Sequence, residues 1–281
     1  MRKQAIIGLI VVIASVAGIY IAYQSYFYVS TDNATVQAQT TLLSSKISGI
    51  IVKANVQENE KVKAGQVLVE IKPDDFKNQV DQLESDEGSL AAQVKGAEIT
   101  YRRTLDLLSK GASTQERLDN ARIQLQSLRE KLKSAQAQAA SAKINLDYTR
   151  VTAPTDGKVG RKSFEVGMLA NPGQPLLGFV EGTERWVVAN LKETDLDHVS
   201  EGNKATVTVD AISGRDFEGV IESISPTTGA TFSLLPPDNA TGNFTKVVQR
   251  VPVRIKLLNL NEHDIDRLQS GLSAEVKIRV H

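Results

Sequence analysis

The chain has 281 residues, enough for two or three small domains, and its 33 basic residues balance 33 acidic residues. This balance gives no support for a nucleic-acid-binding surface, so we expect no nucleic-acid partner. The absence of cysteine excludes thiol nucleophiles, thiolate metal sites and disulfides, and the three histidines do not cluster in the sequence. Composition gives no sign of an enzyme, and we expect neither a cofactor nor a metal site.

Residues 1–29 predict a short cytoplasmic start and a transmembrane anchor. Arg2 and Lys3 precede a stretch without charge that lasts until Asp32, and residues 5–23 are long enough to cross a bilayer as one helix. Aromatic residues follow where an interfacial belt is expected. A cleaved signal peptide is the alternative, but no small-x-small cleavage site directly follows the apolar run. The basic residues predict a cytoplasmic N-terminus, with the rest of the chain across the membrane.

Residues 46–72 and 149–181 are two copies of one short β motif. SGIIVKANVQENEKVKAGQVLVEI begins at Ser48 and DGKVGRKSFEVGMLANPGQPLLGF at Asp156, and the two align at an offset of 108 residues. The alignment matches apolar positions and turn glycines, as in Gly49 with Gly157. We predict that the two half-motifs pair into one small β-sandwich, split by the residues between them.

Residues 73–148, between the copies, predict an antiparallel coiled-coil hairpin. Mostly apolar residues recur at alternating steps of four and three over residues 76–108 and 118–146, which is the heptad pattern of a helical seam. When the chain folds back at Gly111, several facing layers match a large side chain against a small one. With about 35 residues per helix and 1.5 Å per residue, the arm is about 50 Å long.

Residues 182–281 predict a β-barrel domain. Five segments, RWVVANL, KATVTVDA, FEGVIESI, VPVRIKLL and SAEVKIRV, largely alternate apolar and polar residues, which is typical of a half-exposed antiparallel barrel or sandwich. KETDLDHV predicts a short helix between strands. Residues 229–243 form a loop of a length that is often functional. We therefore expect an elongated, mixed α/β chain.

The two half-motifs around a heptad hairpin, with TRVTAPTDGKV at the return, resemble the membrane fusion proteins of the HlyD type. STDNATVQA at residues 30–38 is similar to the strand by which that family enters its β-barrel domain, which implies that residues 30–45 belong to the barrel. GATFSLLPPDNATGNFTKVVQRVPVRI at residues 229–255 resembles the EmrA-like branch specifically. The resemblance implies a lipoyl-like sandwich, a helical hairpin, a β-barrel domain and one N-terminal transmembrane helix.

The resemblance implies a function without chemistry, that of a periplasmic adaptor in a tripartite multidrug efflux system. Such an adaptor spans the bacterial inner membrane once and has the bulk of its chain in the periplasm. It links a drug/proton antiporter of the major-facilitator type to a TolC-type outer-membrane channel, acts as a homo-oligomer (trimer or hexamer), and forms part of the export conduit. The alternative is an adaptor of an ATP-driven type I secretion system, against which residues 229–255 argue.

The hairpin tip is the first candidate contact with a partner. Related adaptors carry an Arg, a Leu four residues later and a Ser beyond the turn, which dock on the channel. Arg103 and Leu107 match this spacing, whereas Ser113 lies one position short of it. Ser113 also fits a structural role, because Ser113 and Glu116 match a capping box for the second helix. Docking and capping both stay open for this serine.

The long loop is the second candidate contact. We expect its residues to contact the antiporter or a neighbouring subunit, and an ordered hairpin tip without such a role is the alternative. The candidate residues are Leu234, Leu235, Pro236, Pro237, Asn239 and Asn243.

We expect neither a modified lysine nor a metal or acid–base site in this chain. Lys72 is nearest to the place of the modified lysine in lipoyl carriers, but the helical arm replaces the carrier's hairpin, so we expect no lipoylation or biotinylation. The acidic residues at 74–75 and the group at 195–198 suit helix capping and solvated surface better than metal or acid–base chemistry. A carrier protein or a coiled-coil scaffold would explain one feature each, whereas an adaptor explains the anchor, the repeat, the arm and the barrel together.

Overall fold

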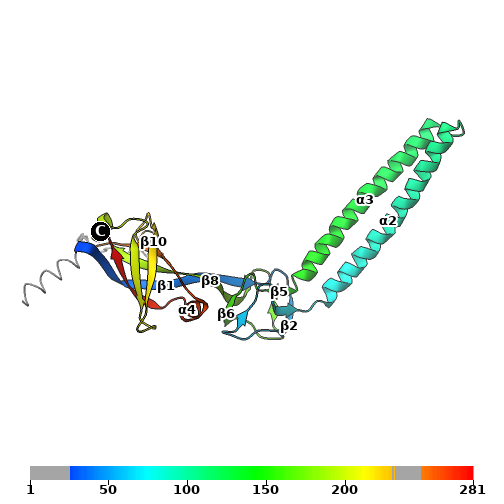
Figure 1. Cartoon of the computed structure of the whole chain (residues 1–281). Coiled ribbons are helices and arrows are strands. Elements are labelled where there is room, and N and C mark those ends of the chain that lie inside the picture. The colour runs from blue at the N-terminus through cyan, green and yellow to red at the C-terminus, as the bar shows by residue number, and fades with distance from the viewer. Residues whose placement is uncertain (1–25, 230, 232–247, 281) are drawn as a thin grey trace, which may run out of the picture. The chain divides into compact units, whose positions relative to one another are not determined.

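The computed structural model describes residues 26–229, 231 and 248–280, which form two compact units (Figure 1). One unit combines the chain up to Thr40 with the chain from Glu181 onward, and the other unit is Thr41–Val180. The predicted transmembrane anchor and the loop residues between 234 and 243 lie outside the described residues. Within the described ranges, no helix combines the length and the apolar character that a membrane crossing requires.

The first unit is a closed six-stranded barrel. Its strands are β1 (Tyr28–Ser44), β8 (Pro175–Lys192), β9 (Lys204–Val209), β10 (Asp216–Ile224), β11 (Arg250–Leu257) and β12 (Ser273–Arg279). They follow the order β1-β12-β9-β10-β11-β8, and pairing of β1 with β8 closes these six strands into a barrel. The sheet continues from β8 through β6 (Gly157–Lys162) to β3 (Lys61–Val62). Alternate residues of β9 and β12 point into the core, so the predicted barrel strands are confirmed.

Two short helices accompany the barrel strands. The segment η1 (Glu193–His198) is the predicted short helix, and it is a 3₁₀-helix. The helix α4 (Glu262–Arg267) was not predicted; it begins with a capping box between Asn261 and Asp264. Asp264 is buried and forms an ion pair with Arg215 in the turn between β9 and β10, with 2.6 Å between Nη2 and Oδ2.

Arg185 of β8 secures the end of α4. Its guanidinium is buried and donates hydrogen bonds to the carbonyl oxygens of Leu268, Glu181 and Glu184, each 2.8 Å long. Burial lowers the pKa of Arg185, and the charge of Asp266 opposes this shift. The buried cation is therefore satisfied by backbone carbonyls, as burial of a charge requires.

The second unit contains the sandwich and the helical arm. Its short strands are β2 (Gly49–Ala54), β3 (Lys61–Val62), β4 (Val67–Ile71), β5 (Arg150–Thr152), β6 (Gly157–Lys162) and β7 (Leu169–Ala170). The arm consists of α2 (Asp74–Ser109) and α3 (Gln115–Asp147), which lie side by side in Figure 1. The split sandwich and the helical hairpin that the sequence predicts are therefore both present.

The hydrogen bonds of the sandwich repeat at the offset found in the sequence. Asn59 N–H donates to the carbonyl of Val159, and at the equivalent positions Gly167 N–H donates to the carbonyl of Ile51, both at 2.8 Å. The bond from Gly65 N–H to Ala153 repeats in the same way as a bond from Gly173 N–H to Ser45. Because equivalent bonds link opposite halves, the two copies are related by a pseudo-twofold axis.

The turns and the core follow the same symmetry. Gly65 and Gly173 adopt φ angles of 76° and 80°, a left-handed conformation that favours glycine. Equivalent interior positions are fully buried in both halves, as for Ile51 with Val159 and for Leu68 with Leu176. The predicted alignment of the two half-motifs is confirmed.

Gly157 illustrates how closely the strands approach. A Cβ atom at Gly157 would meet the carbonyl oxygen of Val180 and lie 2.5 Å from the ring of Phe179. We expect Gly157→Ala to lower the free energy of unfolding by about 2 kcal/mol, because neither backbone nor a buried ring can yield without repacking. Calorimetric unfolding of the detergent-solubilised chain measures this loss.

Gly160→Ala is the matched control, because the nearest atom to its added Cβ would be the carbonyl oxygen of Gly178 at an ordinary 3.5 Å. We expect this control to change the stability by less than ~0.5 kcal/mol. Equal losses from the two variants would contradict the close packing at Gly157.

Candidate functional site

The arm is held together by the seam that the heptad pattern predicts. Every predicted seam position in α2 and α3 is buried or half-buried, and most other positions are exposed. The buried positions in α3 are three leucines in its first half and three alanines in its second half, and the alanines leave room for larger side chains of α2. They are Leu118, Leu125, Leu128, Ala135, Ala139 and Ala142.

Ion pairs flank one side of the seam. Lys143 Nζ lies 2.6 Å from Glu84 Oε1, and Arg129 Nη2 lies 3.7 Å from Glu98 Oε1. The two residue numbers add to the same total in each pair, so the register of the helices is constant between them. The hydrogen bond and the charge of Glu84 raise the pKa of Lys143. Three of these four side chains are exposed and Glu98 is half-buried, so the pairs fix the register and add little to stability.

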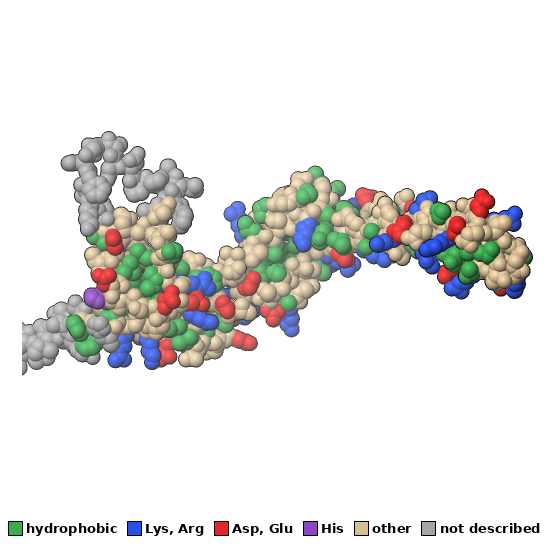
Figure 2. All heavy atoms as spheres, turned by 90° about the horizontal axis from the view of Figure 1, so that it is seen from above, with side chains coloured by type: hydrophobic (Ala, Val, Ile, Leu, Met, Phe, Trp, Pro, Cys, Tyr) green, Lys and Arg blue, Asp and Glu red, His purple; other side chains and the backbone are tan. Residues whose placement is uncertain are grey.

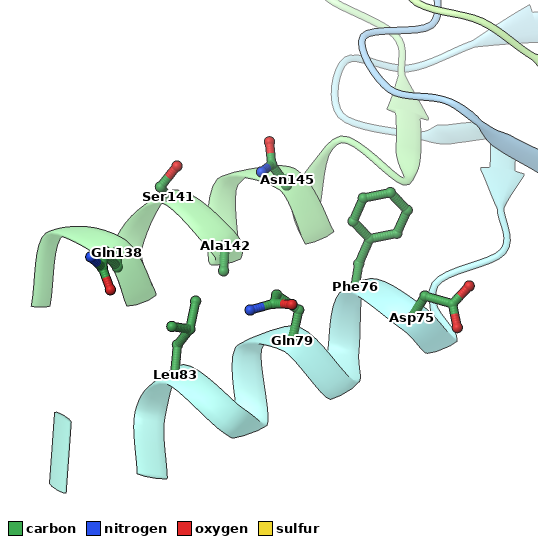
Figure 3. A pocket seen from close by; sticks show the side chains of 8 residues that line it. All are labelled: Asp75, Phe76, Gln79, Leu83, Gln138, Ser141, Ala142 and Asn145. Carbon is green, nitrogen blue, oxygen red and sulfur yellow. The ribbon is translucent and has the colours of Figure 1, made fainter. Parts of the chain in front are cut away.

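A groove opens between the helices near their junction with the sandwich (Figure 3). Its volume is about 420 Å³, and Phe76, Leu83 and Ala142 line it together with the amides of Gln79 and Gln138. In Figure 3 the side chains of Leu83 and Ala142 point toward each other across the groove. The small alanine leaves this space open, and the polar part of the lining consists of three amides, the hydroxyl of Ser141 and the carboxylate of Asp75.

Gly111 ends the first helix of the arm by a Schellman motif. Gly111 has a φ of 73°, its N–H donates to the carbonyl of Leu108 at 2.9 Å, and the N–H of Ala112 donates to the carbonyl of Leu107 at 2.8 Å. These bonds satisfy two carbonyls that the helix end leaves open. The chain turns back at Gly111, and this left-handed backbone conformation is the cause of the turn.

The predicted capping role of Ser113 is wrong, because Thr114 caps the second helix. Thr114 is extended (φ −108°, ψ 154°), and its hydroxyl accepts a hydrogen bond from Arg117 N–H at 3.4 Å. The Schellman turn uses residues 111 and 112, so the helix begins at Gln115, one residue later than a cap at Ser113 requires. Ser113 is half-buried in the connection between the helices.

Arg103 and Leu107 are both exposed on the last turns of α2, one helical turn apart on the same side. The neighbouring Arg102 forms an ion pair with Glu98 at 2.9 Å, on a different side of the helix. The structure thus brings Arg103 and Leu107 together at the tip, with Ser113 beyond the turn. Their docking role stays a prediction.

Three exposed apolar residues that lie opposite the seam of the arm, Ile99, Ile123 and Ile144, were missed by the sequence analysis. They occupy outward heptad positions, and the arm carries basic and acidic side chains along its surface (Figure 2). An apolar residue at an outward heptad position was the signal that could have found them.

The candidate loop residues between 234 and 243 lie outside the described chain. Among the described residues, no three His, Asp or Glu side chains gather to hold a metal ion.

Two family models match the chain. The RND MFP barrel-sandwich hybrid domain matches residues 39–180, and the CusB-like beta-barrel domain matches residues 185–232. The colistin resistance protein EmrA of Acinetobacter baumannii is 32% identical, over 94% of this chain and 91% of its own. The multidrug export protein EmrA of Haemophilus influenzae is 29% identical, over 99% of this chain and 84% of its own.

Solved structures share the fold. MacA from Actinobacillus actinomycetemcomitans matches with a TM-score of 0.70 at 20% identity, over 91% of this chain and 80% of that chain. The periplasmic adaptor protein EmrA matches with a TM-score of 0.51 at 21% identity, over 90% of this chain and 99% of that chain.

The left-handed backbone at Gly111 and the helical backbone at Gly96 predict opposite effects of a change from glycine to alanine. We expect Gly111→Ala to lower the free energy of unfolding by about 1 kcal/mol, because alanine disfavours a left-handed φ. We expect Gly96→Ala, in the middle of α2 with no atom within 4 Å of an added Cβ, to raise it by up to about 1 kcal/mol. Thermal unfolding followed by the helical circular dichroism signal measures both, and equal signs would contradict the assignment of the turn.

Proposed function

Because this chain belongs to the membrane fusion protein family, we propose that it is the periplasmic adaptor of a multidrug efflux system. The predicted resemblance to the EmrA-like branch is confirmed by relatives at about 30% identity over most of the chain. Members of this family are non-enzymatic components of efflux systems. The observation that carries the proposal is the rigid arm inserted between two halves of one sandwich, since such an element supplies reach and no chemistry.

The partners follow from the same reasoning. A stretch over residues 5–23 that is long enough to cross a bilayer favours a single helix in the bacterial inner membrane, with the bulk of the chain in the periplasm. Similarity to multidrug export proteins favours an inner-membrane antiporter of the major-facilitator type at one end and a TolC-type outer-membrane channel at the other. The chain acts as a homo-oligomer, a trimer or a hexamer, whose copies together enclose part of the export conduit.

The arm sets the distance between these partners. Its helices contain 36 and 33 residues, so at 1.5 Å per residue the arm is about 50 Å long. A packed seam with constant register keeps this length fixed, and the Schellman turn keeps the tip compact. We infer that Arg103, Leu107 and Ser113 dock on the helical ends of the channel, because the first two are exposed at the tip and Ser113 does not cap a helix.

The tip proposal predicts that Arg103→Asp impairs export without unfolding the arm. Reversal of an exposed charge at a docking surface removes a favourable contact and adds a repulsive one, so we expect about a tenfold loss of affinity for the channel. Drug susceptibility of cells that carry only the variant adaptor, together with its copurification with the channel, measures the effect.

Arg102→Asp is the control, because Arg102 is also exposed but forms its ion pair within α2. We expect this variant to retain drug resistance. Loss of resistance from both variants, or from neither, would contradict docking through the side of α2 that carries Arg103.

The loop supports a second contact proposal. Residues 234–243 combine leucines, prolines and asparagines in a long connection between β10 and β11. We infer that Leu234, Leu235, Pro236, Pro237, Asn239 and Asn243 contact the antiporter or a neighbouring subunit.

We expect deletion of residues 233–242 to leave the barrel folded, because the pairing of β10 with β11 lies outside the deleted segment. We expect the same deletion to abolish drug efflux, because it removes most of the proposed contact residues. Circular dichroism checks the fold, and drug susceptibility checks export. Unchanged resistance in the deletion variant would show that the loop is only a connection.

A further inference from the structure

The groove between the two helices of the arm combines apolar side chains with polar groups that have no partner. Phe76, Leu83 and Ala142 form the apolar part of its lining (Figure 3). Within the part of the chain that the structure describes, none of the five polar side chains of the lining has a hydrogen bond or an ion pair. They are Asp75, Gln79, Gln138, Ser141 and Asn145. Both kinds of group are therefore available to a bound molecule.

The volume of the groove suits a small organic molecule. Its value of about 420 Å³ lies within the range of about 300 to 1,000 Å³ that is usual for ligand sites. The space exists because the buried positions of α3 are alanines at this end of the arm, namely Ala135, Ala139 and Ala142, and leucines nearer the tip. Larger side chains here would add contacts between the helices, so holding the helices together does not explain the alanines.

The two flanks of the seam differ in charge. On one flank, ion pairs join Glu84 to Lys143 and Glu98 to Arg129 across the helices. The groove opens on the other flank, where the heptad pattern gives Gln79 and Gln138 the positions that correspond to these pairs. Among the described residues no ion pair bridges the groove, so its entrance stays open.

The lining carries one charge, which is negative. Asp75 is the only ionisable residue among the eight described residues that line the groove. The lysines closest to it in the arm are paired elsewhere, because Lys72 lies 3.9 Å from Asp74 and Lys143 lies 2.6 Å from Glu84. In Figure 3, Asp75 and the ring of Phe76 lie at the end of the groove that is nearest the strands. A carboxylate and an aromatic face both attract positive charge, so this end favours a cation.

We propose that the groove binds an amphipathic organic cation, a molecule with an apolar or aromatic body and one positive charge. The body packs on Phe76, Leu83 and Ala142, the charge lies at the end that carries Asp75, and the amide of Gln79 bonds to polar atoms of the ligand. An anion would meet the carboxylate of Asp75 without any basic side chain in the lining to offset it.

The bound molecule contacts both helices at the base of the arm. Phe76 also packs against the core of the sandwich, so the ligand lies where the arm joins the sandwich. This inference goes beyond the proposed function, in which the arm supplies reach alone. It requires neither the channel nor the antiporter, so binding can be measured on the purified chain.

Fluorescence titration with ethidium, an aromatic cation whose emission rises when it leaves water, tests the site. We expect the full chain in an uncharged detergent to bind ethidium saturably. We expect Asp75→Asn to raise the Kd about fivefold, the size expected of one partly exposed ion pair. Asp74→Asn is the matched control, because Asp74 lies in the same first turn of α2 but does not line the groove. It should leave the Kd unchanged. Absence of saturable binding, or equal effects of the two changes, would overturn the proposal.

A second pair of variants tests the space itself. Ala142→Leu places a larger side chain in the groove and should abolish saturable binding of ethidium, whereas Ala140→Leu, at an exposed position of α3 outside the groove, should retain it. Thermal unfolding by circular dichroism checks that each variant is folded. The titration is repeated with 8-anilinonaphthalene-1-sulfonate, an aromatic anion, and a site for this anion that Ala142→Leu removes would refute the preference for cations. Failure of the proposed function is a separate result, because it appears as a chain that confers no drug resistance whatever the purified protein binds.

Discussion

The architecture depends on one constraint, which is that the two ends of the helical arm lie close together. A single backbone hydrogen bond marks this constraint. Ile71 is the last residue of β4, and its N–H donates to the carbonyl of Thr149, directly after the arm, at 2.7 Å. The chain can meet itself there because an antiparallel helical pair returns to its starting point whatever its length. An arm of this kind can therefore be inserted into a sandwich without separating the halves, since β4 still pairs with β5 beyond the insertion.

The two copies differ most where each leaves the sandwich. Ile71 and Phe179 are equivalent and both fully buried, but Pro73 follows the first and Glu181 follows the second at the same distance. Proline cannot continue a strand ladder and suits the start of a helix, so the first copy turns into α2. The second copy has no such break, and β8 continues from residue 175 to residue 192 into the barrel unit. A small change in sequence thus directs two similar motifs to an arm and to a barrel.

The sequence could predict the elements that repeat. The seam of the arm, the paired half-motifs and the alternating barrel strands each extend over several periods, so one irregular residue does not hide them. Features that depend on a few residues were harder to predict from the sequence. Ser113 and Thr114 are both capping residues, and the choice between them depended on how many residues the turn at Gly111 uses. The helix α4 has only six residues, and only the spacing of Asn261 and Asp264 announces it. Arg185 bonds to the carbonyl of Leu268, which lies 83 residues later in the chain, so no local pattern encodes the burial of its guanidinium.

The pseudo-twofold also separates structural from functional requirements. Interior positions such as Leu68 and Leu176 must both be apolar, because the halves complete one shared core and a polar residue in either would be buried without a partner. Exposed positions have no such coupling, so side chains on equivalent backbone can differ freely. A difference there, as between Leu169 and Lys61, cannot be attributed to the fold, since the fold is the same on both sides. In a duplicated domain, each half therefore serves as the structural reference for the other. Positions that have equivalent backbone but different side chains in the two halves are the ones that require an explanation outside the domain.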